Sequence, residues 1–217
     1  MTHDRISLVF RTLSPVPALL LGLAILLSTG CRPPGTGGNP KVPAGARSSG
    51  GLHAVMETEK GSIEIEFLAT DSPKAVENFR LLAEHGYYNG LTFHRIVKGF
   101  MIQGGDPAGN GSGGESAWGG KFPDEIQRDS ALYRRGYRRG LLAMANAGPD
   151  TNGSQFFIIT GNDGAGLPPN YTLFGEVING LDTTVPAMAA LFNPDPGANG
   201  VPPAGEIRIE SVTIRES

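Results

Sequence analysis

Two segments of the sequence combine glycines with polar and aromatic side chains, a mixture that core packing alone does not require. They read FHRIVKGFMIQGGD at residues 93–106 and MANAGPDTNGSQFFII at residues 144–159. The first contains Arg95, whose guanidinium stays charged and presents several N–H donors in a rigid fork. Such a group can stabilise electron density that develops on a substrate, although an arginine on a strand is also typical of a solvated surface.

The aromatic and apolar side chains beside this arginine fit either a ligand pocket or a core. Phe100 and Met101 follow Arg95 closely along the chain. In the second segment, Phe156 and Phe157 are adjacent. Neighbouring residues of a strand point to opposite faces of a sheet. One of the two phenylalanines must therefore lie in the core, which leaves the other free to line a site.

Both segments resemble the signature stretches of cyclophilin-type peptidyl-prolyl isomerases. Three further stretches match the family: PKAVENFRLLAEHGYYNG at 73–90, GNGSGGES at 109–116 and YTLFGEV at 171–177, so that the resemblance extends over residues 54–214. It implies a mainly β fold, a closed eight-stranded antiparallel β-barrel capped by two α-helices. It also implies an enzyme that needs no cofactor and no metal, and whose partners are proline-containing segments of client proteins.

The reaction that this family catalyses explains why its site would contain an arginine. Rotation about an X-Pro amide crosses a barrier of about 18–20 kcal/mol because the C–N bond is partly double. In the twisted transition state the prolyl nitrogen loses conjugation and becomes a better hydrogen-bond acceptor. A donor fixed at that point stabilises the transition state more than the planar ground state. The resemblance assigns this catalytic role to Arg95, and the reaction requires no nucleophile.

The resemblance also assigns the residues that bind substrate. An apolar pocket for the proline ring would be formed by Phe100, Met101, Phe157, Leu167 and, at its edge, Tyr171. Gln103 would hydrogen-bond the carbonyl region of the substrate, and the backbone of Ala145 and Asn146 would pair with the extended peptide like an added strand. The glycine-rich loop at 109–114 would shape the neighbouring pocket for the residue before proline.

Two positions depart from the pattern of the best-known eukaryotic members. Where they carry Trp just before the pocket leucine, this chain has Gly166 ahead of Leu167, and where many have His it has Tyr171. The single tryptophan, Trp118, belongs to a different loop. Because that family Trp contributes to cyclosporin binding, cyclosporin binding by this chain is doubtful. The catalytic arginine, the glutamine and the aromatic floor remain.

Short strands and two helices are predicted to position these segments. Alternation predicts a hairpin of residues 54–57 and 62–67, and Ser72 with Pro73 predicts the start of a helix that stops at Gly86. Further strands are predicted at 91–97, 141–145, 155–160 and 171–178, a second helix between 182 and 191, and a final strand at 207–214 with a bulge near 210–211. Periodicity alone leaves a barrel and a sandwich both open.

The first thirty residues have the layout of a secretory signal peptide, with Arg5 and Arg11 ahead of an apolar run at 18–27. This run is too short for a transmembrane helix, which needs about 20 residues. Cys31 is the single cysteine, and its position resembles the lipobox of bacterial lipoproteins, although Ser28 stands where Leu is usual. Lipidation of Cys31 is therefore expected, and a plain signal peptide with an incidental cysteine is the alternative.

A glycine- and proline-rich stretch follows the cysteine. Six glycines and four prolines fall within residues 31–51, a composition that cannot bury a core. The chain is thus divided into a signal peptide at 1–30, a disordered linker at 31–52 and an isomerase domain at 53–217. These features predict an exported protein, held to a bacterial membrane through acylation of Cys31 and facing the periplasm or the exterior.

Composition excludes several classes of protein. The 217 residues are 39% apolar and 18% charged with a net charge of -3, which excludes collagen-like and wholly disordered chains. An arginine cluster at 134–139 is interpreted as a solvated loop, with no nucleic-acid partner, because the domain is acidic overall. The main hypothesis is an isomerase that assists folding of extracytoplasmic proteins. Its rivals are a module that binds proline segments with incidental turnover, and a sugar- or lipid-binding barrel.

Overall fold

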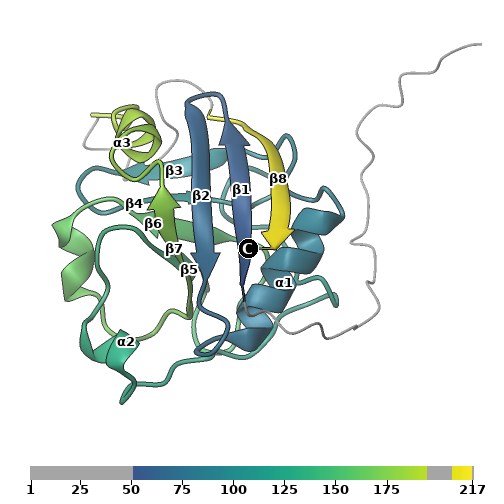
Figure 1. Cartoon of the computed structure of the whole chain (residues 1–217), viewed down its shortest axis with the longest axis vertical. Helices are drawn as coiled ribbons and strands as arrows, with labels where there is room; N and C mark the ends of the chain where they lie inside the picture. Colours follow the sequence, from purple (N-terminus) through teal and green to yellow (C-terminus); the bar gives the residue numbers. More distant parts are fainter. Residues whose placement is uncertain (1–50, 195–206, 217) are drawn as a thin grey trace, which may run out of the picture. The chain divides into compact units, whose positions relative to one another are not determined.

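The computed structural model describes residues 51–194 and 207–216 (Figure 1). The predicted signal peptide, Cys31 and nearly all of the linker lie outside the described residues. The elements along the chain are β1 (Leu52–Thr58), β2 (Gly61–Phe67), α1 (Pro73–Glu84), β3 (Phe93–Val97), β4 (Met101–Gly104), α2 (Ala131–Arg134), β5 (Leu141–Met144), β6 (Phe156–Ile159), the 3-10 helix η1 (Asn162–Gly166), β7 (Leu173–Asn179), α3 (Thr184–Ala189) and β8 (Ile209–Glu216).

The strands form one eight-stranded sheet in the order β3-β4-β6-β5-β7-β2-β1-β8, and all paired neighbours are antiparallel. The two ends of the sheet approach each other, because a bridge joins Thr92 to Arg208 and the Ile209 N–H donates to the Leu91 carbonyl at 2.8 Å. Within the described ranges β3 and β8 form no ladder. The mainly β, eight-stranded antiparallel prediction is therefore confirmed, and a fully closed barrel stays a prediction.

The predicted strands are present with small shifts of their ends. β1 and β2 form the predicted hairpin, in which Ile63 and Ile65 are buried while Glu66 is exposed. The predicted bulge in the last strand is confirmed, since β1 pairs with Ser211 and then with Ile209, passing over the residue between them. β4 was not among the predicted strands, because glycines at 99, 104 and 105 interrupt the stretch that contains it.

Three α-helices occur in the described part of the chain, not the two predicted. α1 begins at Pro73 as predicted, and Gly86 follows its end with a φ of +67°, a backbone conformation that favours glycine. α3 lies inside the predicted range, with Pro186 in the first turn, where it removes no helical hydrogen bond. The additional helix α2 is a single turn, too short to carry a hydrophobic period that a sequence could reveal.

The start of α1 is held by a loop distant in sequence. The Ser72 side chain does not cap the helix, and its hydroxyl instead donates to the Leu173 carbonyl at 2.6 Å. The carboxylate of Glu125 accepts from the backbone N–H groups of Lys74 at 3.0 Å and Ala75 at 2.8 Å. A negative charge at this end of a helix is favourable because the free N–H groups carry a partial positive charge. α1 is therefore fixed to the loop that precedes α2.

Two hydrophobic clusters cover opposite faces of the central strands. The larger cluster contains Phe79 of α1, Ile102 of β4 and Phe156 of β6. The second cluster contains Met101 of β4 and Phe157 of β6, which alternate with those residues along the same strands. The adjacent phenylalanines thus point to different faces, as expected for a strand, and the second cluster faces the candidate site.

Candidate active site

One pocket of about 220 Å³ brings together all nine residues predicted for catalysis and substrate binding. Its lining consists of Arg95, Phe100, Met101, Gln103, Ala145, Asn146, Phe157, Leu167 and Tyr171. Four of these residues lie on the strands β3, β4 and β6. The other five lie in the segments that follow β3, β5 and η1. Residues from five separate stretches of the chain therefore meet at one point.

A chain of hydrogen bonds orients the arginine. Pairing of β3 with β4 places Arg95 opposite Gln103, and the Arg95 Nη1 donates to the Gln103 Oε1 at 3.3 Å. Gln103 Nε2 donates to Gln155 Oε1 at 2.9 Å. Gln155 Nε2 in turn donates to the carbonyls of Gly111 at 3.0 Å and Gly113 at 2.8 Å. Most of the N–H donors of the guanidinium, which has five, remain available to a ligand.

Gln155 is a site residue that the sequence predictions missed. It is buried at 9% exposure. Its side-chain amide hydrogen-bonds to Gln103 of β4 and to the glycine-rich loop, and so links the two. The available signal was its spacing from Phe157, since residues two apart on a strand share a face. A glutamine on the pocket face of a buried strand must find hydrogen-bond partners, and here every polar atom of its amide has one.

Asp106 fixes the glycine-rich loop. Its carboxylate accepts from the N–H groups of Ala108 at 2.9 Å, Asn110 at 3.0 Å and Gly111 at 2.6 Å. Burial acts to raise the pKa of Asp106, but these N–H donors outweigh it and hold the pKa below its usual value. A Cβ on Gly113 would collide with the same carboxylate, so the loop can close around Asp106 only with glycine there.

This loop forms one wall of a second pocket of about 200 Å³. Gln103, Ala145 and Asn146 line both pockets, so the two adjoin. At the rim of the second pocket, the Lys121 ammonium donates to the Gly114 carbonyl at 2.8 Å. The loop predicted to shape a neighbouring pocket therefore does lie beside the first one.

The apolar part of the site is an aromatic cluster. Met101 and Phe157 are buried at 2% and 5% exposure and belong to the second hydrophobic cluster. The Phe157 ring lies 5.4 Å from that of Tyr171 in an edge-to-face arrangement and 6.5 Å from that of Phe100. Such geometry is favourable for aromatic pairs. It leaves a rigid apolar recess beside the guanidinium.

Two buried tyrosines hold Tyr171 at the edge of this recess. The Tyr137 hydroxyl donates to the Tyr171 carbonyl at 2.8 Å and accepts from the Tyr171 N–H at 3.1 Å. The Tyr133 hydroxyl donates to the same carbonyl at 3.2 Å. Burial raises the pKa of both hydroxyls, which therefore stay protonated as donors. These tyrosines belong to the arginine-rich segment, whose structural contribution the sequence predictions did not anticipate.

Of the two backbone segments predicted to pair with a peptide, that of Ala145 already donates a hydrogen bond within the protein. The Ala145 N–H donates to the Gln155 carbonyl at 2.9 Å and so is not available to a substrate. Alternate residues of an antiparallel strand point their backbone groups to opposite edges, so those of Asn146 point away from Gln155, toward the edge on which the Met144 N–H donates to the Thr172 carbonyl at 2.9 Å. The Asn146 side chain donates to the Asn170 carbonyl at 2.9 Å. Both residues line the pocket, and their pairing with a peptide stays a prediction.

The position where the family resemblance would place a Trp is open in this chain. Gly166 is exposed, and a Cβ placed on it would meet no atom within 4 Å. Trp118 does not substitute for the missing ring, because it packs edge to face against Phe122 at 5.9 Å and is not among the residues that line the pocket.

Two arginines that do not line the pocket form ion pairs with acidic side chains, and His94 is buried in its neutral form. Arg138 pairs with Glu176 at 2.7 Å and Arg139 with Asp182 at 2.8 Å. Burial lowers the pKa of His94, against an opposing effect of the charge on Asp106, so its ring is a neutral neighbour of the site. Among the residues that the structure describes, no group of three or more His, Cys, Asp or Glu side chains could hold a metal ion.

The site therefore combines a guanidinium donor oriented by hydrogen bonds, a small apolar recess and an adjoining pocket with a glycine-rich wall, all on an antiparallel sheet. These features define a site that can hold one compact apolar group beside a hydrogen-bond donor. Residues 53–214 match the family described as cyclophilin-type peptidyl-prolyl cis-trans isomerase/CLD. The chain belongs to this family of enzymes.

Relatives and solved structures agree with this assignment. Peptidyl-prolyl cis-trans isomerase CYP18-1 of Arabidopsis thaliana is 45% identical over 163 residues, which cover 75% of this chain and 96% of the relative. Peptidyl-prolyl cis-trans isomerase 10 of Caenorhabditis elegans is 51% identical over 132 residues, 61% of this chain and 79% of the relative. A crystal structure of a Cryptosporidium parvum cyclophilin-type isomerase, in the presence of the dipeptide Ala-Pro, superposes with a TM-score of 0.67 at 37% identity, covering 76% of this chain and 99% of that one.

Proposed function

We propose that Arg95 is the catalytic donor of this isomerase and that its substrates are X-Pro bonds in extended segments laid across the pocket. One observation carries the proposal. The guanidinium of Arg95 opens onto the same recess of about 220 Å³ that Met101 and Phe157 line. A proline ring seated in that recess has its nitrogen beside a charged N–H donor.

Catalysis follows from the difference between the planar and the twisted amide. In the planar amide the prolyl nitrogen is conjugated and accepts hydrogen bonds poorly, whereas at the twisted transition state its lone pair is localised. A donor already in place stabilises that state without reorganising. Gln103 holds the guanidinium through its Oε1, and the apolar floor keeps the ring still while the rest of the peptide rotates.

The peptide on either side of the proline is proposed to bind along Asn146 and into the second pocket. The backbone N–H and C=O of Asn146 would pair with the substrate as an added strand. The pocket behind the glycine-rich loop would take the side chain before proline, and its volume of about 200 Å³ limits the size of that side chain. The Cryptosporidium parvum relative crystallised with Ala-Pro supports a proline-containing ligand.

A protease-coupled assay on a short X-Pro peptide tests the mechanism. Arg95→Ala should lower kcat/KM by about 10²–10³, the usual loss when one transition-state donor is removed. Arg134→Ala is the matched control, because it removes an exposed arginine outside the pocket. If the Arg95 and Arg134 variants turn over equally, Arg95 is not the donor. If the protein binds the peptide without turnover, it is a proline-binding module.

We also propose that the protein is exported and acts on extracytoplasmic clients while anchored by a lipid on Cys31. The proposal is supported by the apolar run ahead of a lone cysteine and by the glycine- and proline-rich linker after it. The family match begins at residue 53 and does not bear on it. No helix in the ranges 51–194 and 207–216 is long and apolar enough to cross a membrane.

Metabolic labelling with a fatty acid tests the anchor. The wild-type protein should carry the label and fractionate with membranes, and Cys31→Ala should lose both properties. Label that survives this substitution would refute acylation at Cys31. Unlabelled wild-type protein found outside the cell would identify a plain signal peptide.

A further inference from the structure

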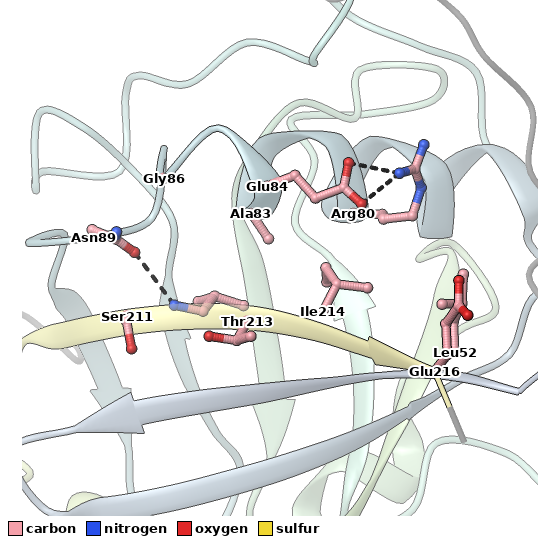
Figure 2. Close-up of a pocket in the computed structure, with 11 residues that line it drawn as sticks. Leu52, Arg80, Ala83, Glu84, Gly86, Asn89, Ser211, Thr213, Ile214 and Glu216 are labelled. Atoms are coloured by element: carbon pink, nitrogen blue, oxygen red, sulfur yellow. Dashed lines mark hydrogen bonds and ion pairs between the residues drawn. The ribbon is translucent and has the colours of Figure 1, made fainter.

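A groove of about 450 Å³ lies between the end of α1 and the strand β8 (Figure 2). It shares no lining residue with the proline pocket and is about twice its volume. Ala83 and Glu84 of α1 form one wall, and the residues of β8 from Ser211 to Ile214 form the other. The isomerase chemistry makes no use of this groove.

The β8 wall of the groove is an unpaired sheet edge. β1 occupies one edge of β8, and the start of β8 is covered on the other edge, where Gly90 donates to the Ile209 carbonyl at 2.7 Å. Further along, the Val212 N–H points away from β1 to the Asn89 Oδ1 at 3.3 Å. Backbone groups alternate between the two edges, so those of Ile214 also point into the groove. Among the described residues they have no hydrogen-bond partner.

The side chains of the groove suit an extended chain with small apolar groups on one face. Val212 and Ala83 are buried at 6% and 4% exposure. Ile214 points toward α1, as Figure 2 shows. The edge of β8 from Val212, whose N–H is bound by Asn89, to Glu216 spans about 13 Å at roughly 3.3 Å per residue step. It therefore accommodates a segment of about five residues.

The charges around the groove favour a cation. Arg80 is nearly buried, and its guanidinium is bound by Glu77 and by both carboxylate oxygens of Glu84 at 2.6 and 2.7 Å. Its single positive charge is thus shared between two carboxylates. The Glu84 side chain remains 43% exposed at the rim, and Glu216 is exposed at the end of β8. The lining carries excess negative charge.

We propose that the α1–β8 groove is a second peptide-binding site, where a short extended segment of a partner protein adds to the free edge of β8. The segment has small apolar residues facing Ala83 and Ile214, and a Lys or Arg that reaches Glu84 or Glu216. Main-chain hydrogen bonds supply the affinity and the carboxylates supply the preference for a cation. The site requires no proline in its ligand and does not depend on turnover at Arg95.

Binding is tested on the full chain with a fluorescein-labelled octapeptide of alternating valine and threonine, with a lysine near each end and no proline. Fluorescence anisotropy should detect saturable binding to wild type and to Arg95→Ala alike. N-methylation at one set of alternate peptide residues should weaken binding by about tenfold or more, the loss expected for two backbone hydrogen bonds. N-methylation at the other set should have little effect. Equal effects of the two sets would overturn strand addition.

Variants of the protein test the location. Ile214→Pro removes the N–H that faces the groove while the ladder to β1 keeps its bonds, so binding should be lost while isomerase activity reports that the domain is folded. Glu216→Gln should weaken binding by about twofold to fivefold, as for an exposed ion pair. Glu66→Gln, which removes an exposed carboxylate from β2, is its matched control. Equal losses in the two glutamine variants would place the peptide elsewhere.

Two other occupants would overturn the proposal. If the linker of the same chain fills the groove through its own cations, Lys41→Ala combined with Arg47→Ala should tighten peptide binding. If a second copy fills it, sedimentation should detect a dimer that Ile214→Pro dissociates. A partner segment is the occupant if the linker variant binds the peptide as wild type does and the protein sediments as a monomer.

Discussion

Gln155 connects Arg95, the proposed catalytic donor, to the glycine-rich loop through hydrogen bonds. Substitutions of Gln155 can therefore test the orientation of Arg95 separately from the position of the loop. Its Oε1 accepts from Gln103, which in turn holds Arg95. Its Nε2 donates to the carbonyls of Gly111 and Gly113. Gln155→Leu removes all three hydrogen bonds at similar side-chain volume. Gln155→Glu keeps an acceptor for Gln103 but removes both donors to the loop.

The expected loss of stability follows from the number of hydrogen bonds. At about 0.5–1.5 kcal/mol for each net hydrogen bond, Gln155→Leu should lower the free energy of unfolding by about 3 kcal/mol. A domain of this size loses roughly 2–4 °C of Tm per kcal/mol, so Tm should fall by about 6–12 °C. Gln155→Glu should destabilise at least as much, because its carboxylate faces the Gly111 and Gly113 carbonyl oxygens.

The two variants should differ in activity. Without the acceptor for Gln103, Gln155→Leu should lose about tenfold in kcat/KM, equivalent to about 1.4 kcal/mol of transition-state stabilisation. Gln155→Glu should retain kcat and instead show altered KM for peptides that differ in the residue before proline. Protease-coupled kinetics at a temperature well below both Tm values, with urea unfolding in parallel, would measure both effects. Equal kcat/KM in the two variants would refute the orientation of Arg95 through these amides.

Three further predictions concern the groups around the pocket. Tyr137→Phe removes a donor and an acceptor that hold the Tyr171 backbone, so it should raise KM severalfold with little change in kcat, measured on the same peptide. Asp106→Ala should release the glycine-rich loop, and hydrogen exchange at residues 108–113 should rise while the core stays protected. Because burial lowers the pKa of His94, the folded protein binds this proton less readily than the unfolded chain. Its stability to urea should therefore fall as the pH drops below about 6.5, and His94→Gln should flatten that dependence.

The sequence predicted those parts of the fold that depend on local patterns. Alternation along 62–67 and the Ser72-Pro73 start of α1 concern neighbouring residues, and both elements are present. The cap of α1 could not be predicted in this way, since it comes from Glu125. The sequence did not predict β4, which pairs with β3 and β6. It did not predict α2 because a single helical turn is too short to show a repeating hydrophobic pattern.

The residues of the site likewise fall into two groups, those predicted from the sequence and those found only from the structure. The side chains of the proline pocket were predicted from motif resemblance, and the structure brings all nine residues together. Residues that act on those side chains carry no such motif. Tyr137 contacts Tyr171 across 34 positions of sequence, and the use of the Ala145 N–H by Gln155 depends on the register of β5 and β6. Both are properties of tertiary contact.

The pairing of β1 with β8 has a consequence for biosynthesis. β1 is the first strand of the domain and β8 the last, and Leu52 lies opposite Glu216. On a ribosome, β1 emerges early but has no partner on this edge until β8 has also left the exit tunnel. Contacts between residues so distant in sequence also slow folding, because a long loop must close before they form. The sheet is therefore completed only after β8 has emerged, and until then the nascent domain exposes an unpaired edge of β1.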